Sequence, residues 1–145
     1  MNIIDLETLY QLPTYSKFPL VVVKGNGTFV WDETGKKYLD FYGGHAVALL
    51  GHCYKPIVDA ICQQASKLIF YSNIVYNDMR AKVAQELVGL FPLAFSKVFF
   101  GNSGTEANET ALKLAKKYTG KDGVVSFLGS IHGRTAGALR SQEHT

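Results

Sequence analysis

Apolar and polar residues follow one pattern in the first third of the chain and a different pattern after it. The first third holds three short runs rich in β-branched and aromatic residues, with Gly-Asn-Gly and Glu-Thr-Gly between them. These runs are residues 20–24, 28–32 and 37–41. Because the turns between them are short, we expect the runs to pair as a small antiparallel meander. A short helix is expected over residues 3–11, and Pro13 and Pro19 separate it from the meander as an arm.

Helical spacing begins at Pro56. Apolar residues at intervals of three and four predict one helix over residues 56–68 and a second one that Asn77 caps. The order then becomes strand, helix, strand, over residues 97–100, 104–118 and 123–128. This order predicts a βαβ unit with parallel strands and a right-handed crossover, and therefore an α/β fold.

This change in the spacing of apolar residues divides the chain into two expected parts. Residues 1–55 hold the arm and the antiparallel meander, which form part of a small domain. Residues 56–145 hold connecting helices and the start of a large domain with a mostly parallel sheet. A single βαβ unit leaves the edges of its sheet unpaired, and the last residues supply no closing strand. We therefore expect the chain to be truncated inside a larger domain.

Composition narrows the class of protein without identifying it. The 145 residues are 47% hydrophobic and 19% charged, as in a globular domain, so disorder is not expected. A formal charge of +3 is scattered along the chain, which argues against a nucleic-acid partner. The longest apolar run, residues 18–23, is too short for a membrane span, and the acidic start lacks the features of a secretory signal. We therefore expect a cytoplasmic protein that binds neither nucleic acid nor membrane.

Two cysteines and two histidines raise the question of a metal site. Cys53 and Cys62 are too few for a disulfide framework, and a reducing compartment would keep both as thiols. Together with His45 and His52 they match no compact zinc pattern such as paired Cys-x-x-Cys. We expect no metal site.

The stretch GNSGTEANETALKLA, residues 101–115, carries the most chemical information. A predicted strand runs into a Ser-Gly-Thr turn and then into a helix, so unpaired backbone N–H groups and the helix dipole face an anion. The hydroxyls of Ser103 and Thr105 can add hydrogen bonds, and Gly104 lets a phosphate approach closely. An ordinary helix start, with Ser103 as cap and Glu106 completing a capping box, explains the same residues equally well. The stretch lacks the Gly-Lys-Ser or Gly-Lys-Thr ending of a Walker loop and the three-glycine spacing of a dinucleotide site.

Four blocks of sequence, in the right order, carry a family resemblance. GNSGTE resembles the phosphate cup of the class III pyridoxal-phosphate-dependent aminotransferases. Residues 25–53 (GNGTFVWDETGKKYLDFYGGHAVALLGHC), Ser72-Asn73 and residues 128–135 (LGSIHGRT) resemble other shared segments of that family. Within it, Tyr-Gly-Gly-His-Ala-Val and Asn-Ser-Gly-Thr-Glu-Ala-Asn-Glu are most similar to acetylornithine aminotransferases. The resemblance implies a fold-type I transferase, with pyridoxal 5'-phosphate as cofactor.

The resemblance also assigns cofactor contacts. It implies that the backbone amides of Gly104 and Thr105 hold the cofactor phosphate, assisted by the side chain of Ser103 or Thr105. His132 has a counterpart beside the cofactor ring, and no proton-transfer role is assigned to it. Ile131 departs from the family, which has Phe or Tyr stacked on the ring at this position. A branched aliphatic side chain offers dispersion contact without an aromatic face, so altered cofactor affinity or reactivity is expected.

Two residues are candidates for substrate binding. In relatives, the position of Arg134 binds the α-carboxylate of the amino-acid substrate, which suits the planar fork of a guanidinium. Taken without the family, Arg134 is simply a surface arginine after a glycine. Tyr42 follows the third expected strand and either lines the substrate pocket or packs beside the glycine pair.

The implied reaction moves an amino group from the side-chain end of N-acetylornithine to 2-oxoglutarate, a step of arginine biosynthesis. Ornithine, succinylornithine and carrier-bound lysine aminotransferases are close alternatives, and the family implies a homodimer. In the family the Schiff-base lysine and the aspartate on the pyridine nitrogen lie downstream, so we expect no catalytic residue in this chain and no activity from it alone. A non-enzymatic phosphate-binding α/β fragment, a nucleotide enzyme and an inert gene fragment remain as rival interpretations.

Overall fold

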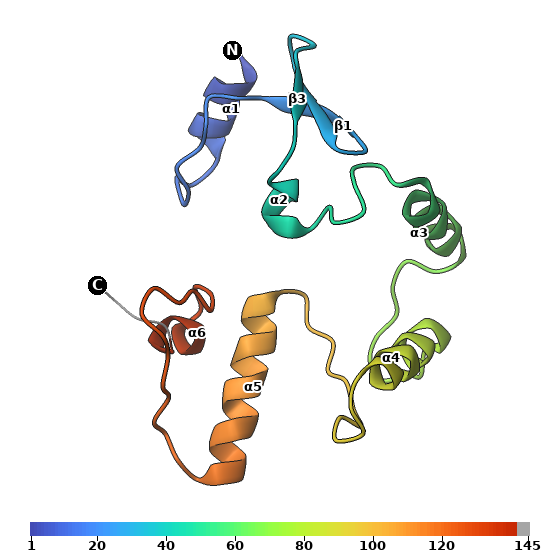
Figure 1. Ribbon diagram of the computed structural model, residues 1–145, viewed down its shortest axis with the longest axis vertical. Helices are drawn as coiled ribbons and strands as arrows, with labels where there is room; N and C mark the ends of the chain where they lie inside the picture. Colours follow the sequence, from blue (N-terminus) through green and yellow to red (C-terminus); the bar gives the residue numbers. More distant parts are fainter. Residues whose placement is uncertain (142–145) are drawn as a thin grey trace. The chain divides into compact units, whose positions relative to one another are not determined.

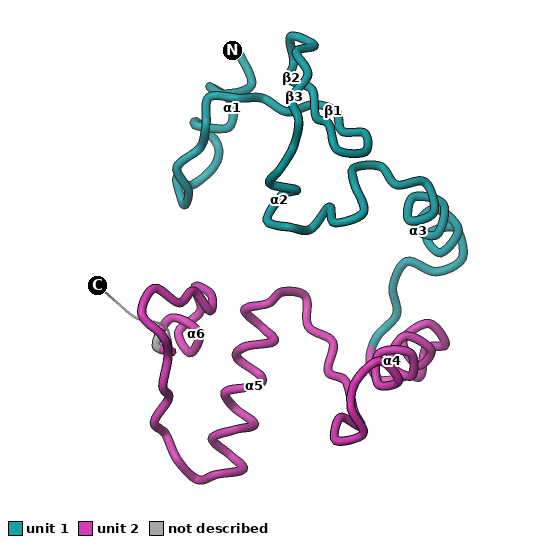
Figure 2. The backbone as a smooth tube through the Cα atoms, in the orientation of Figure 1, with its two compact units in different colours: residues 1–72 teal, residues 73–145 magenta. Residues whose placement is uncertain are grey.

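The computed structural model describes residues 1–141, which contain six helices and three strands (Figure 1). The chain divides into two compact units, Met1–Ser72 and Asn73–Thr145 (Figure 2). The first unit holds α1, the three strands, α2 and α3. The second unit holds α4, α5 and α6.

The three strands form the predicted antiparallel meander. β1 (Val22–Asn26), β2 (Phe29–Asp32) and β3 (Lys37–Leu39) pair in the order β1-β2-β3 (Figure 1). A register irregularity lies between Val22 and Lys24. Over the sheet, the ammonium group of Lys37 lies 3.6 Å from the centre of the Phe29 ring. Short turns close both hairpins, so pairing follows from sequence neighbours alone.

Asp32 organises the turn between β2 and β3. Its Oδ1 accepts hydrogen bonds from the backbone N–H and hydroxyl of Thr34, at 2.9 and 2.7 Å, and from the N–H of Lys36 at 3.0 Å. Its Oδ2 accepts from the Tyr38 hydroxyl at 2.7 Å. The bonds from Thr34 and Tyr38 stabilise the carboxylate, and they lower the pKa of Asp32 from 3.8 to about 2.

The helices of the first unit have well-defined starts. α1 (Ile3–Tyr10) begins with a reciprocal capping box between Asn2 and Asp5, and α3 (Lys55–Lys67) has Pro56 in its first turn. α2 (Gly43–Ala46) is a single turn whose φ angles are all positive, between 57° and 60°. Two glycines make this left-handed turn accessible, since the conformation costs residues with a Cβ about 1–2 kcal/mol each.

The second unit confirms the helices that periodicity predicts there. α4 (Asp78–Leu90) begins at the predicted cap, where the Asn77 side chain accepts from the N–H of Arg80 at 3.0 Å. α5 (Gly104–Thr119) ends at Gly120, whose φ of 67° is the left-handed conformation common after helices. α6 (Ala136–Arg140) follows Thr135 and has no counterpart in the predicted pattern.

The two strands predicted around α5 are wrong for the described part of the chain. Residues 97–100 and 123–128 are coil, so the βαβ unit reduces to a helix between two unpaired segments (Figure 1). A parallel strand exists only where a neighbour accepts its ladder of hydrogen bonds, and residues 1–141 provide none at either place. Val125 and Phe127 accordingly expose 99% and 88% of their surface.

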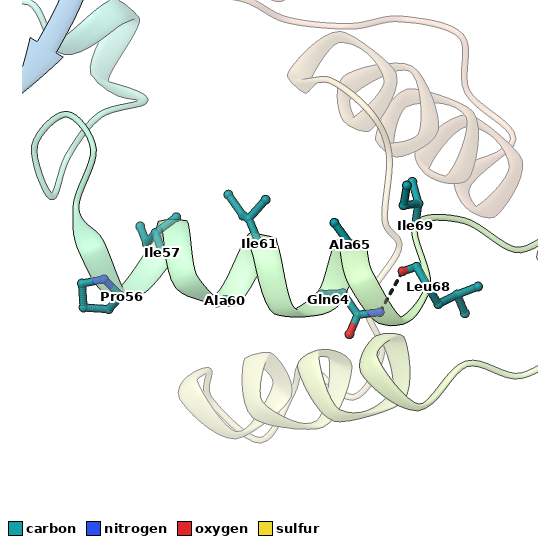
Figure 3. Close-up of a pocket in the computed structure, with 8 residues that line it drawn as sticks. All are labelled: Pro56, Ile57, Ala60, Ile61, Gln64, Ala65, Leu68 and Ile69. Carbon is teal, nitrogen blue, oxygen red and sulfur yellow. Dashed lines mark hydrogen bonds between the residues drawn. The ribbon is translucent and has the colours of Figure 1, made fainter.

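Most apolar side chains of the described chain are exposed. Ala138 is the one buried apolar residue among those whose burial is described, and Asp32 and Ser141 are buried polar residues. α3 carries an apolar groove, and Figure 3 shows Ile57, Ile61 and Ala65 projecting from the same side of the helix. Within residues 1–141, no helix is both long and apolar enough to cross a membrane.

Candidate functional site

The start of α5 is a well-capped helix terminus. The Ser103 hydroxyl oxygen accepts from the N–H of Glu106 at 3.2 Å, as the sequence predicts. The Glu106 carboxylate accepts from the N–H of Asn102 at 2.5 Å, one residue beyond the expected capping box. The N–H of Ala107 donates to the carbonyl of Ser103 at 3.1 Å. Capping and the first helical bond therefore satisfy the N–H groups of Asn102, Glu106 and Ala107.

The amides of Gly104 and Thr105 remain available at this terminus. Neither N–H has an acceptor within residues 1–141, as expected for the first residues of a helix. Gly104 also faces open space, since a Cβ added to it would meet no atom within 4 Å. Two free donors beside a space that a side chain would fill form a cradle for an anionic oxygen group.

The segment after residue 128 lies against the first turns of α5. Gly133 has a φ of 134°, and a Cβ there would collide with the side chain of Thr105. Thr105 therefore packs against Gly133, so its hydroxyl is less available to a ligand than the sequence suggests. One turn further on, the Asn108 amide donates to the carbonyl of His132 at 2.7 Å. These contacts bring residues 132 and 133 beside the cradle.

Glu109 accepts hydrogen bonds from the next part of the same segment. Its Oε1 accepts from the Thr135 hydroxyl at 2.5 Å, from the N–H of Gly137 at 2.8 Å and from the N–H of Ala138 at 3.2 Å. The Thr135 bond is the largest cause that lowers the pKa of Glu109, and the Ala138 and Gly137 amides and Lys113 add to it. The glutamate is therefore ionised at neutral pH and caps the first turn of α6.

The residues predicted beside the cofactor ring differ in how firmly they are held. His132 is half-buried, and its Nδ1 lies 3.1 Å from the hydroxyl oxygen of the buried Ser141. Ile131 exposes 86% of its surface, and Arg134 is exposed. His132 and Arg134 thus belong to the short segment that contacts α5 through residues 132 and 135.

Tyr42, the second candidate for substrate binding, belongs to the first unit. Its side chain is 61% exposed, and its ring centre lies 4.8 Å from that of His45. It borders a hollow of about 250 Å³ behind the left-handed turn of α2. The N–H groups of Tyr42 and Gly43 donate to Oδ1 of Asp40 at 2.8 and 2.9 Å, while Oδ2 of Asp40 lies 2.6 Å from Nε2 of His52.

The hydrogen bond with His52 is the main cause that lowers the pKa of Asp40, followed by the amides of Gly43 and Tyr42. His52 is fixed from the other side as well. Its backbone forms two hydrogen bonds with Gly27, of 2.9 and 2.8 Å, and its side chain fills the space beside Gly25. The loop that carries Tyr42 is therefore ordered by contacts inside the first unit.

The cysteines and the α3 groove lie outside this site. Cys53 and Cys62 are free and exposed, and residues 1–141 hold no cluster of three His, Cys, Asp or Glu side chains that would suit a metal ion. The α3 groove is lined by apolar residues and Gln64, whose amide donates to the Leu68 carbonyl (Figure 3). It offers no charged group to an anion.

A family model matches most of this chain. The model of the family described as aminotransferase class III matches residues 10–144. The chain belongs to the class III aminotransferases. The family depends on pyridoxal phosphate, which confirms the cofactor class that the resemblance implies.

Individual class III aminotransferases are similar over most of this chain. The acetylornithine aminotransferase of Methanopyrus kandleri is 45% identical over 139 residues, which are 96% of this chain and 36% of that protein. A crystal structure of acetylornithine aminotransferase from Elizabethkingia anophelis, 42% identical, has a TM-score of 0.74 and covers 80% of this chain and 28% of its own. The ornithine aminotransferase of Toxoplasma gondii ME49, 30% identical, has a TM-score of 0.85 and covers 97% of this chain and 35% of its own.

These likenesses confirm the fold-type I transferase fold for the part that is covered. The chain spans about a third of the length of such relatives. The cradle also fits a cofactor phosphate on its own geometry, through the amides of Gly104 and Thr105 and the open space at Gly104. Sequence reasoning missed Asn108 and Glu109, because their partners lie 24 to 29 residues away and no local spacing marks them.

Proposed function

We propose that the protein carrying this chain is an acetylornithine aminotransferase. It transfers an amino group from the side-chain end of N-acetylornithine to 2-oxoglutarate, a reaction of arginine biosynthesis. The observation that carries the proposal is the cradle at Gly104, which has two free amides and room for a phosphate in a class III aminotransferase. The likeness to the enzyme of Methanopyrus kandleri favours the acetylated substrate.

The residues of α5 hold the cofactor phosphate in this proposal. The amides of Gly104 and Thr105 donate to it, and the positive end of the α5 dipole adds to the attraction. Ser103 assists, because its oxygen already accepts from Glu106 and its hydroxyl hydrogen remains to donate. The Thr105 side chain packs against Gly133 and contributes less.

Residues 131–134 act on the ring and the substrate. Ile131 and His132 lie beside the cofactor ring, where Ile131 offers dispersion contact only. Arg134 binds the α-carboxylate of the amino acid and of the 2-oxo acid through its planar fork. Tyr42 lines the substrate pocket of the assembled enzyme.

Pyridoxal phosphate supplies the electron sink that makes amino transfer possible. No lysine of the chain is in the sequence context of the family's cofactor lysine, since Lys113, Lys116 and Lys117 lie on α5 beyond the cradle. We therefore expect residues 1–145 alone to be inactive. Purified chain treated with pyridoxal phosphate and borohydride should show scattered, substoichiometric lysine labelling by mass spectrometry. One dominant, fully modified lysine together with transamination would contradict this expectation.

The complete protein that contains these residues provides the main test. It should bind pyridoxal phosphate and transaminate N-acetylornithine with 2-oxoglutarate, measured by cofactor absorbance and by glutamate formation. Arg134→Lys should raise KM for the amino donor and the oxo acid, because an ammonium lacks the bidentate fork, and should leave cofactor affinity unchanged. Failure to bind the cofactor would overturn the proposal.

Transfer from ornithine is a second candidate. The Toxoplasma gondii ornithine aminotransferase has the higher of the two TM-scores, 0.85, and covers 97% of the chain. Comparing kcat/KM for ornithine with that for N-acetylornithine separates the two functions. Succinylornithine and carrier-bound lysine belong in the same comparison as further donors.

The assembled enzyme is proposed to be a cytoplasmic homodimer whose partners are amino-acid and 2-oxo-acid substrates. Cys53 and Cys62, which are exposed and form no disulfide, fit a reducing compartment. Analytical ultracentrifugation and cell fractionation test these two statements.

A further inference from the structure

We propose that Glu109 is a positioning residue, which holds the segment around Arg134 at a fixed place beside the phosphate cradle. The proposal rests on the proposed function, because it assigns a purpose to the contact through Arg134. Glu109 itself touches neither the cradle amides nor the Arg134 guanidinium in any contact found among residues 1–141.

The hydrogen bonds of Glu109 hold the residues that follow Arg134. One carboxylate oxygen accepts from Thr135, the residue after the arginine, and from the backbone of Gly137 and Ala138. All three donors are 26 to 29 residues away in sequence, so the contact is tertiary and not a turn. It joins the second turn of α5 to the start of α6.

A second set of contacts holds the other side of the arginine. Asn108 donates to the carbonyl of His132, two residues before Arg134, and Gly133 packs against Thr105. Arg134 is therefore bracketed on both sides by consecutive turns of α5. The same helix presents the cradle amides at its first two residues, so a single rigid element sets both positions.

The shape of the segment is adapted to the carboxylate. A Cβ at Gly137 would collide with the carboxylate of Glu109, so the glycine allows the close approach. The lowered pKa of Glu109 indicates that the three donors favour the ionised form, which strengthens each bond. Both observations point to a charged, closely fitted anchor.

Position matters here because Arg134 works by geometry. A guanidinium recognises a carboxylate through two parallel hydrogen bonds, and a small displacement loses one of them. Loosening the segment should therefore weaken substrate binding, while the cradle amides, which belong to α5, keep their place.

The test compares wild-type complete protein, loaded with pyridoxal phosphate, with Glu109→Gln, Glu109→Ala and the control Glu86→Gln. Glu86 is an exposed glutamate of α4, so its substitution makes the same chemical change on another helix. We expect KM for both carboxylate substrates to rise about tenfold in E109Q, the loss expected for a charge-assisted hydrogen bond, and further in E109A. Cofactor affinity and kcat should change less than twofold in E109Q, and E86Q should match wild type.

Hydrogen exchange by mass spectrometry, on protein without cofactor, gives a second readout. Amides of residues 135–141 should exchange faster in both Glu109 variants, while those of residues 104–115 should not change. A loss of folded protein alone would lower kcat and leave KM unchanged. That result, or unchanged exchange over 135–141, overturns the proposal. If wild-type protein fails to transaminate, the proposed function fails, and the exchange data still decide whether Glu109 holds the segment.

Discussion

Two carboxylates fix two loops of this chain, and they do so over very different distances in sequence. Asp32 in the first unit accepts four hydrogen bonds from residues two to six positions later. Glu109 in the second unit accepts three from residues 26 to 29 positions later. The first contact closes a hairpin turn that the sequence predicts by itself. The second contact shapes the candidate site, and no local sequence pattern predicts it.

The segment opposite Glu109 should be the more sensitive of the two to substitution. Gly133→Val places a branched side chain at a φ of 134° and against Thr105, so overlap and backbone strain add. We expect it to destabilise the complete protein by about 3 kcal/mol, measured by urea denaturation. Gly123→Val is the matched control, because a Cβ there meets no atom of the described residues within 4 Å. Equal midpoints for both variants would show that the segment does not pack on α5.

Asp32→Asn should have a smaller effect that depends on pH. The pKa of Asp32 is depressed to about 2 in the folded state from 3.8, so its stabilisation is present above pH 3.8 and lost as pH falls toward 2. The variant should therefore be less stable than wild type at pH 6, and the gap should narrow between pH 4 and pH 2. Urea midpoints at these pH values measure it. A gap that is constant with pH would contradict the contacts assigned to Asp32.

Local patterns account for much of the fold. The meander, α3, α4 and α5 depend on spacing and on caps such as Asn77, which act within a few residues, and all are confirmed. Strands at 97–100 and 123–128 are not, because a strand depends on a neighbour that local sequence does not contain.

The candidate site was only partly predictable for the same reason. Ser103 and Gly104 stand in one turn, where cap and anion chemistry can be recognised from sequence. Asn108, Glu109 and Gly133 meet only after the chain has folded back on α5. Their residue types, an amide, a carboxylate and a glycine, are common on helices and turns. Only the three-dimensional contacts distinguish them.

Asn108→Ala should have the smallest effect among these substitutions. It removes one hydrogen bond, to the carbonyl of His132, while Glu109 still anchors the far side of the segment. We expect a loss of about 1 kcal/mol in the free energy of unfolding. Because each anchor still holds the segment when the other is lost, the combination with Glu109→Ala should destabilise by more than the sum of the single variants. Strict additivity would indicate that the anchors act independently.

The phosphate cradle is the central claim, and Gly104 tests it most directly. A Cβ at this position meets no atom of residues 1–141 within 4 Å, and Leu forms helix more readily than Gly, so we expect Gly104→Leu to fold about as stably as wild type. The new side chain should nevertheless block the phosphate and raise the dissociation constant of pyridoxal phosphate at least about tenfold, measured by absorbance titration of the complete protein. Gly89→Leu is the matched control, since Gly89 is a helical glycine of α4 with equally open surroundings. Tenfold weaker binding in G104L alone, with urea midpoints maintained, is the predicted result. Wild-type cofactor affinity in a folded G104L protein would contradict the account.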